Sequence, residues 1–201
     1  MKTASWICAG LVALASPAHA DAPYRGIGVG VTAGGGVTGF TDSGMRDVTN
    51  TVGGLWDLRV MIGTHTNIGL ELGYTGTAAS VETFAGADNG TLIGTTLEGV
   101  GRWNLMPTSA LMPYLFVGVG WQHYSLTDSH FATADTGMSD HDDILDVPAG
   151  LGLSYRARGG LLVDVRGTFR VATFNDLLVK PDGDDAQLHT WQASAAIGYE
   201  M

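Results

Sequence analysis

The stretch Leu161-Leu162-Val163-Asp164-Val165-Arg166-Gly167-Thr168-Phe169-Arg170-Val171 decides the fold class of this chain. Apolar side chains share one parity, and Asp164, Arg166 and Arg170 occupy the other. A two-residue period indicates a β-strand whose two faces meet different surroundings. The same rhythm recurs about eight times along the sequence, with glycine, hydroxyl groups and charges opposite the apolar positions.

Alternation and turn signals together predict eight strands. They run near 26–38, 54–64, 67–78, 91–104, 113–125, 144–156, 160–174 and 188–201. Long polar connections (39–53, 79–90, 126–143 and 175–187) alternate with shorter ones (65–66, 105–112 and 157–159). This alternation is typical of an up-and-down barrel with long extracellular loops and short periplasmic turns. The sequence therefore predicts an all-β fold, an eight-stranded antiparallel transmembrane β-barrel. Pro148 cannot donate to a strand ladder, so it predicts a bulge or the upper margin of the sixth strand.

The apolar parity is expected to face lipid, because it carries most of the large aromatic residues and many of them lie near strand ends, as interfacial girdles do. In a soluble barrel the same residues would form the core, with the charges outside. The aromatic set comprises Trp56, Tyr74, Trp103, Trp121, Tyr155, Trp191 and Tyr199.

The polar parity carries five acids and five arginines, which balance. They are Asp57, Arg59, Glu71, Glu98, Arg102, Asp146, Arg156, Asp164, Arg166 and Arg170. Such pairing is required in a narrow lumen, because an unpaired buried charge is costly. Glu71, Glu98 and Asp164 are the expected partners of Arg59, Arg102, Arg166 and Arg170. Removal of Lys2 with a leader takes the net charge from −10 to −11, and the four long connections hold this excess.

An export signal is predicted at the N-terminus. Lys2, the apolar run 4–15, Pro17 and Ala18-His19-Ala20 fit a leader that is cleaved before Asp21. The expected domains are thus a signal peptide at 1–20 and a barrel domain at 21–201. The single cysteine, Cys8, lies in the leader, so the mature chain is expected to hold no disulfide. No later run of about 18 apolar residues predicts a spanning helix.

Three segments resemble the small outer-membrane β-barrel family of OmpA, OmpX and OmpW type. They are Pro113-Tyr114-Leu115-Phe116-Val117-Gly118-Val119-Gly120-Trp121, Gly150-Leu151-Gly152-Leu153-Ser154-Tyr155-Arg156 and Trp191-Gln192-Ala193-Ser194-Ala195-Ala196-Ile197-Gly198-Tyr199. The resemblance implies a bacterial outer-membrane location. The family usually ends its last strand on Phe or Trp, where this chain has Met201.

The third long connection, 126–143, holds the weak metal candidates, in which carboxylates would suit calcium or magnesium and imidazoles a transition metal. They are His130, Asp140, His141, Asp142 and Asp143. The spacing matches no defined metal loop, so a solvated acidic loop is the main expectation and no cofactor is predicted.

His123 and Ser125 share the outward parity with Trp121, and this His-x-Ser pair resembles the motif of the outer-membrane lipid A deacylase family. A serine nucleophile needs a base and an acid that orients the base. The following strand offers Asp143 or Asp146, of which Asp146 has the inward parity.

The sequence predicts a structural or surface-interaction role without catalysis. The alternative is a narrow pore or an OmpW-like path for small solutes, and a lipid A deacylase-like hydrolase is third. Large aromatics or leucine in the lumen would favour the solute path, whereas the lumen is expected to hold glycine and charge. Outer-membrane lipid, lipopolysaccharide and the barrel-assembly machinery are the expected partners. The acidic balance disfavours nucleic acid, and no surface partner is named.

Overall fold

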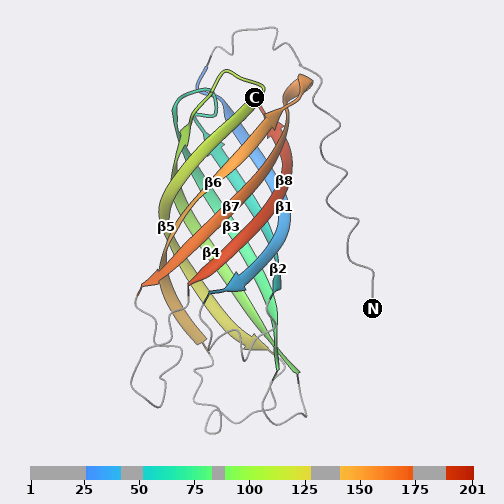
Figure 1. Cartoon of the computed structure of the whole chain (residues 1–201), viewed down its shortest axis with the longest axis vertical. Helices are drawn as coiled ribbons and strands as arrows, with labels where there is room; N and C mark the ends of the chain where they lie inside the picture. Colours follow the sequence, from blue (N-terminus) through green and yellow to red (C-terminus); the bar gives the residue numbers. More distant parts are fainter. Residues whose placement is uncertain (1–25, 42–51, 83–88, 128–140, 174–188) are drawn as a thin grey trace.

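The fold is a closed eight-stranded β-barrel, seen in a computed structural model that describes residues 26–41, 52–82, 89–127, 141–173 and 189–201. The strands are β1 (Val29–Phe40), β2 (Gly53–Ile62), β3 (Ile68–Glu82), β4 (Asn89–Asn104), β5 (Leu111–Thr127), β6 (His141–Arg156), β7 (Leu161–Thr173) and β8 (Thr190–Glu200). Each strand pairs antiparallel with the next, and β8 closes on β1 (Figure 1). The predicted fold class and all eight strands are confirmed, and the predicted signal segment lies outside the described residues.

Two connections differ from the sequence prediction because the strands around them are longer. β3 and β4 stay paired up to Glu82 and Asn89, which reduces the second long connection from 79–90 to 83–88. β5 and β6 likewise reduce the third connection to 128–140. At the other end, the turns at 63–67, 105–110 and 157–160 are short, and the last contains the 3-10 turn η1 (Arg158–Gly160). No helix in the described segments is long and apolar enough to cross a membrane.

Pro148 marks neither a bulge nor a strand margin, in contrast to the prediction. It lies inside β6 and is paired with Arg170 of β7. On the β5 side, the pairing stops after Val117↔Ala149 and resumes at Gly120↔Asp146 in the same register. Because proline has no N–H, the ladder is interrupted here without an inserted residue.

The register fixes the stagger of the barrel. Pairing leads once around the wall from Leu115 through Leu151, Gly167, Ala193, Val37, Gly54, Ala78 and Ile93, and arrives back on β5 at Ser125. The path returns ten residues further along the strand (125 − 115 = 10). An eight-stranded barrel with such a stagger has strongly tilted strands and an interior just wide enough for side chains, as the oblique arrows of Figure 1 illustrate.

The outer wall is apolar along all eight strands. Val117, Val119, Leu151 and Leu72 are each more than half exposed, as are Trp56, Trp103, Trp121 and Tyr199 of the aromatic set. Tyr74 also faces outward, and its ring lies 5.2 Å from that of Trp56. An apolar surface that surrounds the molecule requires an apolar solvent.

We expect Val117→Arg to impair folding far more than Met106→Arg. Val117 faces outward near the middle of β5, whereas Met106 is exposed in the turn at 105–110. An arginine at the bilayer midplane costs about 2–4 kcal/mol, and the cost falls toward zero near the interface. Urea titration of each variant folded into lipid vesicles measures the difference. Equal losses would contradict the outward assignment of Val117.

Candidate functional site in the barrel interior

The structure places all ten charged residues of the polar parity inside the barrel, where none is more than 5% exposed. They are Asp57, Arg59, Glu71, Glu98, Arg102, Asp146, Arg156, Asp164, Arg166 and Arg170. As the strand alternation requires, each lies opposite an outward-facing apolar neighbour in its own strand. The interior is therefore a buried ionic network, and its pairing decides what the barrel can do.

Asp164 is the centre of the part of this network that lies nearer the short turns. Its carboxylate accepts hydrogen bonds from Arg59 Nη1 at 2.7 Å and from Ser154 Oγ at 2.6 Å. The Tyr114 hydroxyl lies 3.0 and 2.9 Å from its two oxygens. Arg59 also donates through Nε to Asp57, at 2.9 Å. Four strands (β2, β5, β6 and β7) thus meet on one carboxylate.

Glu98 is the centre of the part of the network that lies nearer the long connections. Its two oxygens face Arg170 Nη2 at 2.5 Å and Arg166 Nη2 at 3.3 Å. Arg166 also pairs with Glu71, and Arg170 Nη1 pairs with Asp146 at 2.7 Å. Acids and arginines therefore alternate along a continuous chain of contacts.

Arg102 does not pair with Glu98, which lies four residues earlier on the same face of β4. Its Nη1 is 3.8 Å from Glu71, and it donates to Asn104 at 2.7 Å and to Ser154 at 2.7 Å. Four residues of extended strand span about 13 Å, which prevents direct contact along one strand. The partners of Arg102 are therefore the adjacent inward residue of its own strand, Asn104, and residues of other strands.

Aromatic rings complete the filling of the interior. The Arg102 guanidinium lies 3.4 Å from the centroid of Tyr114, and that of Arg166 lies 3.7 Å from the centroid of Phe116. The sequence predicts a lumen of glycine and charge, and the structure shows that it holds aromatic rings as well. β5 carries aromatic residues on its inward face as well, and these rings fill space that charged pairs alone would leave open.

At the end with the short turns, Arg156 joins several segments. It donates to Glu200 at 2.6 Å, to the Pro107 carbonyl at 2.5 Å and to the Thr64 carbonyl. Glu200 also lies 3.1 Å from His65 Nε2. Burial lowers the pKa of His65, although the Glu200 carboxylate acts in the opposite direction. Glu200 and His65 were absent from the predicted set, although Glu200 shares its parity with Gln192 and Ser194.

Glycines opposite the large interior side chains provide the necessary space. A Cβ on Gly152 would lie 2.3 Å from the Tyr114 ring, which Asp164 and Arg102 hold in place. A Cβ on Gly73 would lie 2.9 Å from Glu98 Cγ, and Gly73 is the register partner of Glu98. Glycine is required at these two positions because the side chains of Tyr114 and Glu98 pass too close to the backbone to leave room for a Cβ atom.

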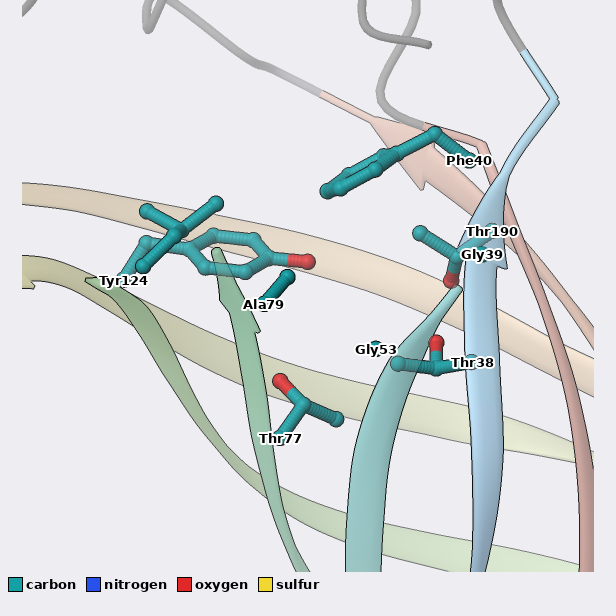
Figure 2. Close-up of a pocket in the computed structure, with 9 residues that line it drawn as sticks. Thr38, Gly39, Phe40, Gly53, Thr77, Ala79, Tyr124 and Thr190 are labelled. Carbon is teal, nitrogen blue, oxygen red and sulfur yellow. The ribbon is translucent and has the colours of Figure 1, made fainter. Parts of the chain in front are cut away.

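The space left between the interior side chains includes two small cavities. One, of about 10 Å³, lies at the mouth near the ends of β1 and β5 and is lined by Phe40, Leu92 and Tyr124 with three threonines (Figure 2). Figure 2 shows the Tyr124 hydroxyl directed across this mouth toward the β1 side. A second cavity of about 10 Å³ lies among Arg59, Glu98 and Arg170. Each has about the volume that one water molecule needs.

Only some of the weak metal candidates lie within the described residues. His130 and Asp140 lie outside the described residues, whereas His141, Asp142 and Asp143 begin β6. Among the residues searched within the described segments, no three His, Cys, Asp or Glu side chains form a metal-binding group. For the hydrolase hypothesis, Asp146 is buried in the lumen, and Asp143 is the register partner of His123.

Comparison with known families identifies the chain. Residues 6–198 match the family model of the outer membrane protein β-barrel domain. The chain belongs to this family. This outer-membrane barrel is thus a protein of the bacterial outer membrane, in agreement with its apolar wall. No curated protein matches it.

Solved structures share the fold of this outer-membrane barrel at low identity. OprG from Pseudomonas aeruginosa is 15% identical with a TM-score of 0.57, over 87% of this chain and 95% of that chain. Ail from Yersinia pestis, in complex with the heparin analogue sucrose octasulfate, is 14% identical with a TM-score of 0.55, over 87% and 98%. The N-terminal barrel domain of Pseudomonas aeruginosa OprF is 12% identical with a TM-score of 0.54, over 87% and 98%.

We expect Glu98→Gln to destabilise the barrel strongly. The substitution leaves Arg166 and Arg170 with a neutral partner in a buried interior, and breaking a buried pair costs about 3–5 kcal/mol. Arg158→Gln, at an exposed position in η1, is the control and should cost about 0–1 kcal/mol. Urea unfolding in lipid vesicles gives both values. A Glu98→Gln protein as stable as the parent would show that the pairing contributes little.

We expect Gly152→Ala to destabilise the barrel and Gly99→Ala to leave it unchanged. The added methyl at 152 must displace the Tyr114 ring, and overpacking of this kind costs about 1–3 kcal/mol. A Cβ on Gly99, which faces outward, meets no atom within 4 Å. Unfolding midpoints of the two variants test the claim, and equal midpoints would mean that Tyr114 moves without cost.

Proposed function

We propose that this protein is a closed structural barrel of the outer membrane that presents its extracellular connections to the surroundings and catalyses no reaction. The observation that carries the proposal is the filled interior. Asp164 and Glu98 each hold arginines from other strands, and aromatic rings stack on two of these arginines. Ions would have to break several buried pairs at once to pass, which supports a non-conducting barrel.

The surface role is supported by the charge of the long connections. Between Phe40 and Thr190, these connections and the strand ends beside them carry thirteen Asp and Glu residues against Arg46 and Lys180. A surface of this sign attracts cations and cationic partners and repels polyanions. Ail was solved with a sulfated polyanion, and we propose that this chain does not share that class of ligand.

In the membrane, lipid and lipopolysaccharide contact the apolar wall. We also propose that the barrel-assembly machinery inserts the chain, since β8 must meet β1 to close the barrel. Met201 follows β8 and pairs with Val29 through two backbone hydrogen bonds of 2.8 and 2.9 Å. The final residue thus takes part in the closing seam.

Solute passage is the second candidate, and both the inward aromatic residues of β5 and the interrupted ladder at Pro148 favour it. Between β5 and β6 the wall lacks paired residues at 118–119 and 147–148, in the middle of the apolar band. Small apolar solutes would use this break as a side opening. Pro148→Ala restores an N–H donor, so it should reduce uptake by cells if this path operates.

Planar-bilayer recording of the refolded protein tests the proposed function. We expect no steady single-channel conductance, because the interior cavities have only about the volume of one water molecule. A porin recorded in the same bilayers shows that insertion and detection work. Regular conductance steps would contradict the closed barrel, and Pro148-dependent solute uptake would favour the second candidate. Lipid A hydrolysis that Ser125→Ala abolishes would contradict the non-catalytic role.

A further inference from the structure

A groove on the outer wall lies over β2, β3 and β4, in the half of the barrel that leads to the short turns. Its volume is about 430 Å³, within the range of about 300–1,000 Å³ for pockets that hold small ligands. It is far larger than the two cavities of the lumen, and it lies outside the barrel. The outward-facing residues that line it are Val60, Ile62, Leu70, Leu72, Gly99 and Gly101.

Two outward glycines of β4 form the floor of this groove. Gly99 lies between its register partners Leu72 of β3 and Val119 of β5, and Gly101 likewise lies between two large apolar partners. A Cβ on Gly99 would meet no atom within 4 Å, and one on Gly101 would meet only the Val117 carbonyl oxygen at 3.8 Å. The four register partners of these glycines are each more than half exposed, since no side chain of β4 covers them from that side. The glycines therefore leave an open channel between two apolar ridges.

Large side chains of β4 close the floor at both ends. Leu97, near the middle of the strand, and Trp103, near its end, both face outward and are about half exposed. The six residues between them span about 20 Å of strand. With the tilt of about 35–45° that is usual in such barrels, this is about 15 Å along the membrane normal, half of a hydrocarbon core of about 30 Å. The groove thus extends over the depth of one leaflet.

We propose that this groove binds one acyl chain of a glycerophospholipid, with the headgroup near Trp103. The protein is an outer-membrane barrel, and the groove is continuous with the apolar wall that meets lipid. Within lipid, apolar groups associate through close packing and not through exclusion of water. An acyl chain is apolar along its length and can contact both ridges and the glycine backbone between them. An empty groove would lose these contacts.

The position of the groove along the barrel decides which lipid it meets. Trp103 lies one residue before the end of β4, and the short turn at 105–110 follows. The short turns of such barrels face the periplasm, where the leaflet of the outer membrane consists of phospholipid, whereas lipid A occupies the opposite leaflet. Trp103 suits the headgroup level, because its ring is apolar and its N–H can donate to polar lipid groups. The expected ligand is therefore a phospholipid, recognised through its acyl chain.

Native mass spectrometry of the refolded barrel tests the site, with dipalmitoyl phosphatidylethanolamine as the added lipid. We expect the parent to retain one lipid per chain at saturation. Gly99→Leu and Gly101→Leu should each weaken retention at least about tenfold, because the new side chain occupies the space of the acyl chain; this corresponds to about 1.4 kcal/mol. A dihexanoyl lipid with the same headgroup should bind less tightly, since its chains are too short to reach Leu97.

Gly167→Leu is the matched control. Gly167 also faces outward, on β7, and a Cβ there would meet only the Leu151 carbonyl oxygen at 4.0 Å. This variant should retain the lipid like the parent. Parent-like retention in Gly99→Leu and Gly101→Leu, or an equal loss in Gly167→Leu, would overturn the proposal. Each variant is first shown to fold by its unboiled gel mobility and its urea midpoint, so that lost retention reports on the groove.

Two further results would assign the groove to a different occupant. Displacement of the phospholipid by an equal amount of lipid A would place a lipid of the other leaflet there. A dimer of the parent in analytical ultracentrifugation that Gly99→Leu dissociates would show that a second copy of the chain fills the groove. Either result would overturn the proposal, whereas a monomeric parent that keeps its phospholipid in the presence of lipid A supports it.

Discussion

Every other feature of this protein depends on the need to neutralise charge inside a narrow closed sheet. An eight-stranded barrel with a ten-residue stagger has room for side chains and little else. Arginines in that space cannot remain unpaired, because a buried charge without a partner costs several kcal/mol. Each of these arginines except Arg59 pairs only with acids on other strands, and Arg59 pairs with one acid of its own strand and one of β7, so that the ionic contacts also tie the wall together across the lumen. Closure and the ionic contacts of the interior thus have a common origin.

The geometry of the interior explains why glycine and aromatic residues share it with charge. Tyr114 reaches Asp164 only because Gly152 leaves space for its ring. Phe116 and Tyr114 then support the planar guanidinium groups of Arg166 and Arg102. Arg156 acts differently, because its partners include turn carbonyls, and these contacts secure the short connections at one end of the barrel. The interior is therefore specified at the level of individual contacts, while the lipid-facing wall requires only apolar side chains.

The shared fold with OprG, OprF and Ail at 12–15% identity follows from this difference. An outer wall can exchange one apolar residue for another, and connecting segments in general vary more in sequence than the strands that they join. The same architecture can therefore carry very different surfaces. In this chain the connections after β1, β3, β5 and β7 are together strongly acidic in sequence.

The sequence by itself determined the eight strands and the parity of the charged residues, because a period of two is a local property of each strand. Asp164, Arg166 and Arg170 could be assigned to one face from β7 alone. Only the tertiary structure decided which acid meets which arginine, since partners up to 105 residues apart, such as Arg59 and Asp164, are brought together by closure and stagger. The same holds for Pro148, whose effect depends on its neighbour in β5, and for Glu200, which meets Arg156 across 44 residues. Alternation along a strand determines whether a side chain points inward or outward. The register between strands, which is set when the barrel closes, determines which side chains it contacts.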